Sequence, residues 1–399
     1  MTEAEVKANA DAMAAKLKSH GWQYIVVDIQ WSDPQAKAHG YRPNAELTMD
    51  GEGRLTPAVN RFPSAAGGKG FGPLAAYIHA KGLKFGIHIM RGVPRKAAIA
   101  ERIADKSSVC QWNSDMYGVD LTKPGGQAYY DSIVRLYASW GVDYIKADDM
   151  ARPLHAAEIE ALHKAILKSG RKIVLSLSPG PADWSQAAFY SANADLWRVS
   201  DDLWDRWQDV KKTFALMDQW SKMQLPGWPD ADMLPLRHIG IRAERGNDRA
   251  SRLTHDEQRT LMTLWCISRS PLMMGGDLPT SDEFTMSLLT NDEVLAADQK
   301  GSKPHQVSQN GDQVEWASGD YLAIFNTGDA PSEFVLTAGV DYPAGRVRDL
   351  WTKQDETWGQ SHKVALPPHG AALYKDGTEI RLAGGTAYPT TIWVRRASN

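Results

Sequence analysis

Short apolar segments that suit β-strands alternate with amphipathic segments that suit helices through residues 1–300. The alternation repeats roughly every 30–50 residues, which is typical of βα units built on a parallel sheet. Residues 91–124 and 224–234 lack a clear period and are expected to be loops, the first with a short helical patch. The expected strands are residues 23–29, 83–90, 142–147, 172–178 and 195–199, and the main expected helices are residues 3–19, 74–81, 126–140, 155–168, 205–220 and 255–269.

Several of these strands end in polar or charged residues, although a parallel strand that is buried on both faces should not carry charge. In a (β/α)8 barrel such strand ends converge on one face, where the active site lies. A doubly wound open sheet would place them along a crevice, but the chain has no glycine-rich phosphate loop to support that fold. We therefore expect a (β/α)8 TIM barrel over residues 1–300. The polar strand ends are Asp28, His88, Asp148, Ser178, Asp201, Asp202, Asp232 and Asp277.

From residue 303 the pattern changes to short strands at regular spacing, separated by Gly, Asp and Pro turns. This pattern predicts a small antiparallel β-sandwich over residues 303–378. Residues 379–399 form a tail of uncertain structure. The strands are expected near residue 307 and at residues 314–317, 321–326, 334–336, 347–351 and 371–374.

Composition excludes several classes of partner. The net charge of -3 indicates no nucleic acid partner, and no apolar run reaches the ~18–20 residues that span a membrane. Residues 1–7 lack the basic and apolar parts of a signal peptide, so the chain as given is expected to be cytoplasmic; a chain without its original leader would be secreted or periplasmic. Cys110 and Cys266 fit neither a disulfide framework nor a metal site, and we expect no metal.

Residues 142–150 contain the clearest candidate for catalysis. They begin with β-branched and aromatic residues, as a buried strand does, and end in Lys146, Asp148 and Asp149. A catalytic carboxylate that the lysine keeps ionised accounts for these charges. An aspartate that caps the following helix accounts for them equally well. The segment alone favours neither interpretation.

Acidic strand ends without a Cys/His cluster favour a pair of carboxylates, as glycoside hydrolysis requires. In the retaining mechanism the two groups lie ~5–5.5 Å apart, one as nucleophile and the other as acid and then base. The candidates are Asp148 or Asp149 and, farther along the chain, Asp201 or Asp202. Arg198 precedes Asp202 by one helical turn's spacing, and it either orients substrate or forms an ordinary surface ion pair.

An ordered set of motifs over residues 2–375 resembles glycoside hydrolase family 27, the family of α-galactosidases and α-N-acetylgalactosaminidases. This resemblance implies a (β/α)8 barrel, a C-terminal antiparallel domain, an exo-acting retaining α-galactosidase and no cofactor. The motifs are residues 21–31 (a strand ending in Asp28, with Trp31 after it), 53–63 (Gly-Arg-Leu and Arg-Phe-Pro), 82–87 (the third strand), 144–148 (Lys-x-Asp), 197–202 (Trp-Arg-x-x-x-Asp) and 228–234 (Trp-Pro-Asp-Ala-Asp-Met-Leu).

The resemblance also implies roles for individual residues. Asp148 is then the nucleophile and Asp202 the acid/base. The expected partner is a carbohydrate with a terminal α-galactoside or a related sugar, while the oligomeric state, a homo-oligomer included, stays open. The residues expected to bind the sugar are Asp28, Trp31, His88, Lys146, Ser178, Arg198, Asp232 and Met233.

Three departures from the family pattern bear on substrate. Ile29 replaces the second of two aspartates that contact the O4/O6 edge of the sugar. Ser178 is small, as in the α-N-acetylgalactosaminidase branch, which needs room for a 2-acetamido group. Met150 replaces one cysteine of a disulfide beside the nucleophile, so that disulfide is not expected. The alternative substrates are therefore an α-N-acetylgalactosaminide and a β-L-arabinopyranoside.

A further departure concerns the first strand of the barrel. Family members begin with a strand whose tryptophan reaches the sugar, whereas this chain begins at the helix after it. Either the barrel is open at this position, or residues 391–394 fill it, or the chain is truncated. A catalytically impaired carbohydrate-binding protein or truncated enzyme is therefore the alternative from another class.

Overall fold

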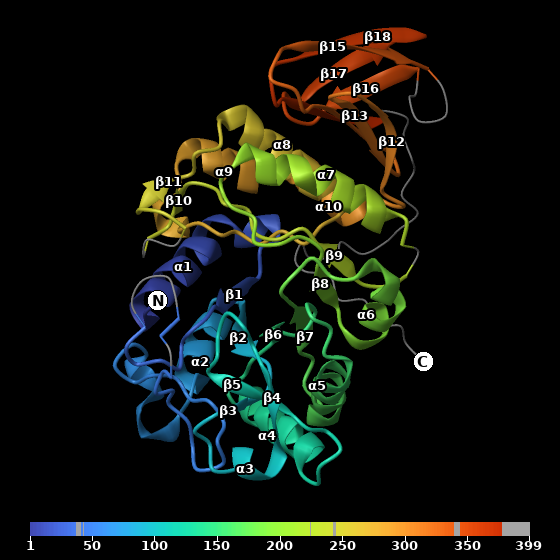
Figure 1. Cartoon of the computed structure of the whole chain (residues 1–399). Coiled ribbons are helices and arrows are strands. Elements are labelled where there is room, and N and C mark those ends of the chain that lie inside the picture. Colours follow the sequence, from blue (N-terminus) through green and yellow to red (C-terminus); the bar gives the residue numbers. More distant parts are fainter. Residues whose placement is uncertain (37–40, 43, 224, 242–244, 339–343, 377–399) are drawn as a thin grey trace.

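In the computed structural model, which describes residues 1–36, 41–42, 44–223, 225–241, 245–338 and 344–376, the first 300 residues surround a parallel sheet (Figure 1). Outside the named strands, Leu234 and Met274 form one further parallel bridge. The strands lie in the order β1 (Tyr24–Val27), β2 (Lys84–Met90), β6 (Tyr144–Asp148), β7 (Val174–Leu177), β8 (Leu196–Arg198) and β9 (Trp228–Asp230), and every pair is parallel. The predicted α/β barrel architecture is confirmed.

Helices between the strands cover the outside of this sheet. Two of them begin with a capping box, in which Thr2 pairs with Glu5 and Thr254 pairs with Glu257. In each box, backbone amides that have no partner within the helix are hydrogen-bonded. The helices are α1 (Glu3–Lys16), α2 (Gly72–Ala80), α3 (Ala100–Ile103), α4 (Gly126–Ser139), α5 (Ala156–Ser169), α6 (Ala187–Asn193), α7 (Trp207–Ser221), α8 (His255–Ser268), α9 (Glu283–Leu289) and α10 (Asp292–Lys300).

One position of the barrel has no strand in the part of the chain that the structure describes. β1 pairs with β2 on one edge, and no described strand pairs with its other edge. Tyr24 and Val26 of β1 are partly buried and pack against the cluster of Tyr144, Val174 and Leu196 from other strands. Residues 391–394, the segment considered for this position, and the tail from residue 379 lie outside the described residues.

Two segments expected to be loops contain strands. Residues 91–124 form a small antiparallel sheet of β3 (Val93–Pro94), β5 (Met116–Val119) and β4 (Ala104–Val109) beside the barrel rim. β9, with the sequence Trp-Pro-Asp, pairs with β8 at the centre of the molecule. These strands are short and partly polar, so their pairing depends on neighbours that are distant in sequence.

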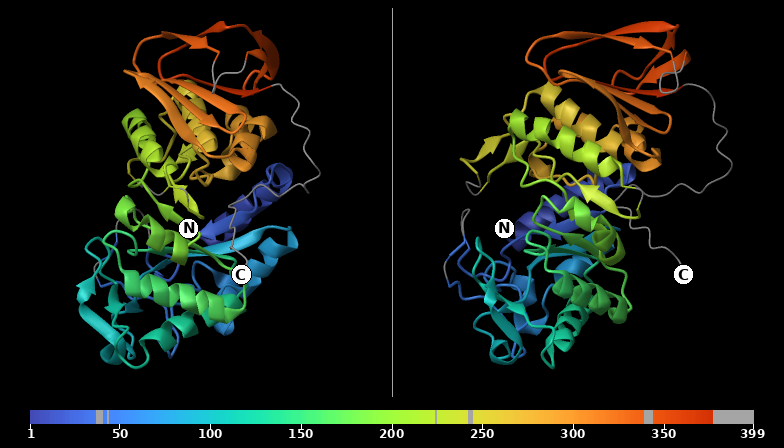
Figure 2. Two further views of the ribbon diagram at one scale, coloured as in Figure 1. Left: turned by 90° about the vertical axis from the view of Figure 1, so that its right-hand side faces the viewer. Right: turned by 45° about the vertical axis from the view of Figure 1, so that its right-hand side comes forward.

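The C-terminal part is the predicted antiparallel β-sandwich, which lies against α7 and α8 (Figures 1 and 2). One sheet has the order β12-β13-β14-β19-β16-β17 and the other pairs β15 with β18. β17 and β18 were not expected because their exposed residues are polar. The strands are β12 (His305–Asn310), β13 (Gln313–Ser318), β14 (Tyr321–Asn326), β15 (Ser332–Thr337), β16 (Gly345–Asp349), β17 (Gln354–Trp358), β18 (Ser361–Leu366) and β19 (Ala371–Asp376).

Helix α8 joins the two parts. Its residues from Glu257 to Ser268 are almost all buried, and Trp265 belongs to the same hydrophobic core as Trp316 and Phe325 of the sandwich. The hydroxyl of Thr260 donates to the carbonyl of His369, which lies just before β19. The core of the barrel therefore continues into the sandwich without a break.

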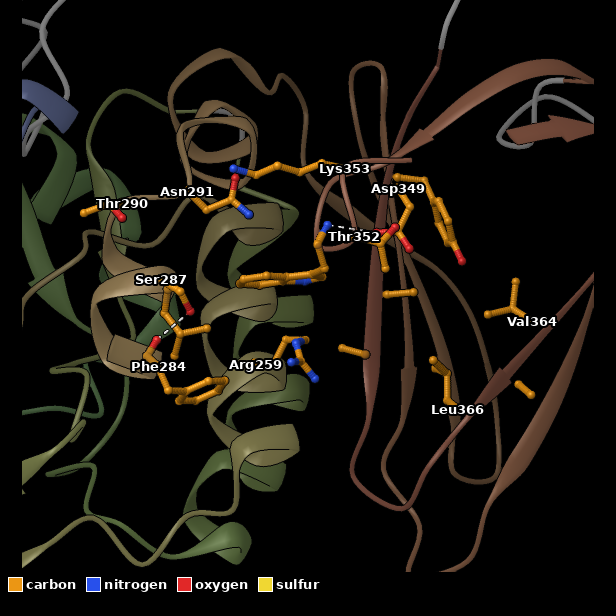
Figure 3. A pocket seen from close by; sticks show the side chains of 16 residues that line it. Arg259, Phe284, Ser287, Thr290, Asn291, Asp349, Thr352, Lys353, Val364 and Leu366 are labelled. Carbon is orange, nitrogen blue, oxygen red and sulfur yellow. Dashed lines mark hydrogen bonds between the residues drawn. The ribbon is translucent and has the colours of Figure 1, made fainter. Parts of the chain in front are cut away.

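A cavity of about 580 Å³ lies at this junction, between α8, α9 and the sandwich (Figure 3). Its polar walls are already bonded within the protein: Asn291 donates to the carbonyl of Leu350, Arg259 pairs with Asp256, and Asp349 accepts from the amide of Thr352. None of the residues predicted to bind sugar lines it. We therefore regard this cavity as part of the domain junction.

In the described part of the chain, no helix is both long enough and apolar enough to cross a membrane.

Candidate active site

Polar residues at the ends of neighbouring strands face one another at the carboxyl-terminal rim of the barrel, as the alternation of side chains along each strand requires. Asp277, another polar residue expected at a strand end, instead accepts a hydrogen bond from Asn9 of α1. His88 of β2 lies opposite Lys146 of β6, and Lys146 lies opposite Ser176 of β7. Lys146 and Asp148 are two residues apart and share one face of β6, while Ala147 between them is fully buried on the other face. The charged residues of the opening motif therefore point into the barrel.

Asp148 lies deep in this site. Its Oδ2 is 3.1 Å from Nε2 of His88, and its Oδ1 accepts a hydrogen bond from the amide of Asp149 at 3.0 Å. Burial alone would raise the pKa of Asp148, but the hydrogen bond to His88 and the charges of His88 and Lys146 outweigh it and hold the pKa well below its usual range. Asp148 is thus ionised at neutral pH, as a nucleophile must be.

Lys146 and Asp28 form an ion pair beside the nucleophile. Nζ of Lys146 lies 3.4 Å from Oδ1 of Asp28. Burial lowers the pKa of Lys146, but the carboxylates of Asp28 and Asp148 exceed that effect and raise it. Burial likewise raises the pKa of Asp28, and Lys146 with His88 lowers it overall. Both groups stay charged, and charged donors and acceptors suit sugar hydroxyls.

Arg198 links two further carboxylates on the other side of the site. Its Nη1 lies 2.8 Å from Asp232, and its Nη2 lies 3.4 Å from Asp202. Asp232 also accepts from the amide of Leu203 at 2.7 Å, and its carbonyl accepts from the indole of Trp265 at 2.9 Å. These bonds hold Asp232 at φ = 86°, in the left-handed region that non-glycine residues seldom adopt.

Asp202 differs from Asp148 in its access to solvent. Its side chain is 49% exposed, against 13% for Asp148. Its second oxygen lies 3.7 Å from Arg245, which belongs to the hairpin of β10 (His238–Ile239) and β11 (Arg249–Ala250). A group that both gives and takes a proton benefits from such access.

The hairpin that carries Arg245 is anchored through a buried carboxylate. Asp205 is 2% exposed and lies 2.6 Å from Arg249 and 3.0 Å from Arg252. Burial alone would raise the pKa of Asp205, but these two guanidinium groups hold it well below its usual range. No motif in the sequence marks Asp205.

Asp230 is a buried residue that supports Asp232. Its Oδ1 accepts from the amide of Asp232 at 2.9 Å, and the residue is 1% exposed. Burial raises its pKa to about 6, although Arg198 acts in the opposite direction.

Trp31, which was predicted to contact the sugar, is buried in the core. Trp31 is 2% exposed and packs edge-on against Phe71, Tyr137 and Trp140 in the core. Its indole N–H donates to the carbonyl of His88 at 2.7 Å, so it supports the strand that carries His88. The motif marked a residue beside the site but not the direction of its side chain.

Two other predicted residues border the site. Ser178 follows β7, and its buried hydroxyl is near enough to Asp148 to lower the pKa of that carboxyl, although its geometry falls short of a hydrogen bond and the hydroxyl has no partner. Met233 follows Asp232 and is partly buried against Gly275, where an added Cβ would lie 2.7 Å from its sulfur.

The arrangement of an ionised buried carboxylate, an accessible one and their basic partners agrees with the family comparison. Residues 99–300 match the family model described as α-galactosidase A, and residues 308–376 match that of the α-galactosidase C-terminal β-sandwich domain. The chain belongs to glycoside hydrolase family 27. This enzyme is therefore a glycoside hydrolase that acts on carbohydrate.

Curated family 27 relatives include plant α-galactosidases. The α-galactosidase of Coffea arabica is 30% identical over 396 residues, which cover 94% of this chain and 89% of that protein. α-Galactosidase 2 of Arabidopsis thaliana is 28% identical over 393 residues, which cover 94% of this chain and 85% of that protein.

Solved family 27 structures include more similar proteins. A variant of the β-L-arabinopyranosidase of Geobacillus stearothermophilus, crystallised in complex with arabinose, is 50% identical with a TM-score of 0.91, and the match covers 94% of this chain and 93% of that one. A Bacillus halodurans protein, provisionally assigned as an α-N-acetylgalactosaminidase, is 43% identical with a TM-score of 0.84 over 94% of this chain and 93% of that one.

This family 27 enzyme has a small recess next to Ile29 at the end of β1. The recess has a volume of about 20 Å³ and is bordered by Ile29, Gln30, His88, Asn113 and Asp115, among others. The amide Nδ2 of Asn113 and Oδ1 of Asp115 are buried and have no hydrogen-bond partner. A space of this size with two polar walls suits one water molecule. No sequence motif marks this recess, because Asn113 and Asp115 lie in the loop between β4 and β5.

Proposed function

We propose that this enzyme releases terminal β-L-arabinopyranose from glycosides by a retaining double displacement, with Asp148 as nucleophile and Asp202 as acid/base. The sequence favoured an α-galactoside as the first substrate and a β-L-arabinopyranoside as an alternative. The 50% identity to a β-L-arabinopyranosidase, against 28–30% to the curated plant α-galactosidases, supports reversing that order.

The two sugars need the same catalytic groups. β-L-Arabinopyranose has the ring configuration of α-D-galactopyranose and lacks only the hydroxymethyl group at C5. One pair of carboxylates therefore serves both substrates, and discrimination depends on the edge of the site that faces C5. Ile29, partly buried at the end of β1, replaces the family aspartate at that edge. It offers no hydrogen bond to a primary hydroxyl, and a buried hydroxyl without a partner costs about 1–3 kcal/mol.

The chemistry follows from the different surroundings of the two carboxylates. Asp148, ionised through His88 and Lys146, attacks the anomeric carbon while Asp202 protonates the leaving oxygen. A covalent glycosyl-enzyme results, with the sugar on Asp148. Asp202, now ionised, takes a proton from water, which displaces Asp148 and returns the sugar with its original configuration. Arg198 contacts Asp202 throughout and limits the repulsion that its new negative charge would meet.

The observation that carries this proposal is the contrast between buried, His88-bonded Asp148 and accessible, Arg198-bonded Asp202 on one barrel rim. The test is kcat/KM for three aryl glycosides: the β-L-arabinopyranoside, the α-D-galactopyranoside and the 2-acetamido-2-deoxy-α-D-galactopyranoside. We expect the pentoside to be the best substrate, and NMR of the first product to show the retained anomer. A galactoside preference would overturn the substrate assignment. Sugar binding without hydrolysis would overturn the enzymatic one.

An α-N-acetylgalactosaminide is the second candidate, and Ser178 is the observation that favours it. Its unpaired buried hydroxyl borders the nucleophile, where a 2-acetamido group needs room and a donor. The Bacillus halodurans relative supports the same candidate. In the substrate panel, preference for the acetamido sugar together with its loss in Ser178→Leu would establish this alternative.

A further inference from the structure

A buried charge network lies directly beneath the nucleophile. Arg91 follows β2, is 3% exposed, and contacts Asp149 through Nε at 2.9 Å and Nη2 at 2.8 Å. Its Nη1 lies 2.6 Å from Glu158 of α5. Glu158 in turn accepts from the hydroxyl of Tyr130 at 2.6 Å and from the amide of Val119 at 3.0 Å. The network therefore ties the residue after the nucleophile to a helix and to the sheet of residues 91–124.

Asp149 connects this network to Asp148. The amide of Asp149 donates to Oδ1 of Asp148 at 3.0 Å, and the carbonyl of Asp149 accepts from Nε of Arg91 at 3.0 Å. Asp149 has φ = 57°, a left-handed conformation that a non-glycine residue keeps only when its surroundings impose it. The amide of Arg91 also donates to the carbonyl of Asp148 at 3.0 Å. Arg91 thus bonds the two carbonyls on either side of the Asp149 N–H that binds the nucleophile.

We propose that Arg91 is a positioning residue, which fixes the Asp149 peptide so that its N–H aims Asp148 at the anomeric carbon. It acts through Asp149 and does not touch the sugar. The inference rests on the proposed role of Asp148 as nucleophile.

The residues around Arg91 leave space for its guanidinium group and stabilise its charge. A Cβ at residue 118 would lie 2.5 Å from Nη1 of Arg91, so Gly118 leaves the room that the guanidinium occupies. Burial alone would lower the pKa of Arg91, but Glu158 and Asp149 exceed that effect and raise it. A buried ion pair adds little net stability over an apolar replacement of equal volume. The ion pair here fixes the position of the Asp149 peptide.

The test compares two arginines at opposite ends of β6. Arg171 lies 2.6 Å from Asp143, just before the strand begins, and serves as the control. We expect Arg91→Met to lower kcat on the best aryl glycoside on the order of 10²-fold, with KM nearly unchanged, because a small misplacement of a reacting group has that cost. Arg171→Met should lower the melting temperature and leave kcat within about twofold, since a surface ion pair contributes to stability alone.

A second readout isolates the nucleophile. The rate at which an activated 2-deoxy-2-fluoro glycoside labels the enzyme reports the attack of Asp148 and not the later hydrolysis. Arg91→Met should slow labelling in proportion to kcat and move the acid limb of kcat/KM to higher pH, because Asp148 loses a hydrogen bond to its charged form. Arg91→Lys, which keeps one charge, should recover part of the rate.

If Arg91→Met does not fold, Glu158→Gln provides the same test, because it removes one charge and keeps the shape. A folded Arg91 or Glu158 variant with normal kcat, normal labelling and an unshifted acid limb would overturn the inference, and so would an equal kcat loss in Arg171→Met. Failure of the proposed function is distinguishable: Asp148→Asn would then keep turnover, whatever the Arg91 variants do.

Discussion

Nε2 of His88 lies 3.1 Å from Oδ2 of Asp148, and His88 is 2% exposed. The histidine reaches this place because β2 and β6 are parallel neighbours whose alternate residues face the barrel interior. Together with Lys146 it lowers the pKa of Asp148 against the effect of burial. A site so arranged keeps its nucleophile charged under mildly acidic conditions.

The first prediction concerns this pair. His88→Asn should move the acid limb of kcat/KM to higher pH, because Asp148 loses the partner that favours its ionised form. His79→Asn is the control, since His79 bonds Asp143 at 2.7 Å beside the other end of β6. Its pH profile should match that of the wild type. Equal acid limbs in the wild type and His88→Asn would assign the low pKa to Lys146 alone.

The second prediction separates neighbouring aspartates. Asp202→Asn should reduce hydrolysis of glycosides with poor leaving groups by a factor on the order of 10³, the scale of general acid catalysis. The rate of Asp201→Asn should stay within a few-fold of the wild-type rate. Asp201 is exposed and accepts a hydrogen bond from the amide of Asp202, and an asparagine can accept the same hydrogen bond. Azide should rescue Asp202→Asn on an activated substrate. A larger loss in Asp201→Asn would exchange the two assignments.

The third prediction addresses the sugar edge. Ile29→Asp should raise kcat/KM for the α-galactoside relative to the β-L-arabinopyranoside by about 10–100-fold, because a hydrogen bond to a charged group contributes about 1.5–3 kcal/mol. Ile29→Val keeps the apolar surface and should retain the pentoside preference. Competition between the two aryl glycosides in one reaction measures the ratio directly. An unchanged ratio in Ile29→Asp would mean that another residue contacts C5.

The fourth prediction follows from the burial of Trp31. Trp31→Phe should lower the free energy of unfolding by about 1–2 kcal/mol, the value of a lost buried hydrogen bond with some packing. KM for the aryl glycoside should stay near the wild-type value because the indole does not reach the sugar. Chemical denaturation and steady-state kinetics measure the two effects. A raised KM with unchanged stability would restore the sugar contact.

The fifth prediction concerns pH and the buried Asp298 of α10. Burial raises the pKa of Asp298 to about 7, with Arg269 acting weakly in the opposite direction. Because its pKa in the folded protein exceeds that of the unfolded chain, ionisation opposes folding above pH 7, and this penalty fades as the pH falls toward about 4. Asp298→Asn should therefore have a higher melting temperature than the wild type at pH 8 and nearly the same one at pH 4. A constant difference across this range would contradict the prediction.

Much of the fold follows from local patterns. The βα repeat, the change of pattern near residue 303 and the glycines after helices are readable because each depends on a few adjacent residues. The sheet of β3, β5 and β4 was not readable, since its strands are short and β4 is largely polar. β9 carries a proline, which argues against a strand in the sequence, yet it pairs with β8 through Arg198 and Asp230.

The candidate site was readable where a motif kept its residues together. Lys146 and Asp148 occur in one short strand, and Arg198 and Asp202 in one turn. The motif at Trp31 gave the position but not the direction of the side chain, which only the packing around it decides. Arg91 and Glu158 lie 67 residues apart and meet only in the folded chain. No pattern within either segment indicates that pairing.

The burial of helix α8 affects how the molecule unfolds. The helix is buried along most of its length, and its side chains contact both the barrel and the sandwich. Glu257 at its start pairs with His369 at 2.7 Å, and Thr263 in its middle accepts from the indole of Trp351 at 3.0 Å. Removing the sandwich would expose these surfaces to water. The change of pattern near residue 303 thus marks where the architecture changes, and we expect the two parts to melt together because each covers apolar surface of the other.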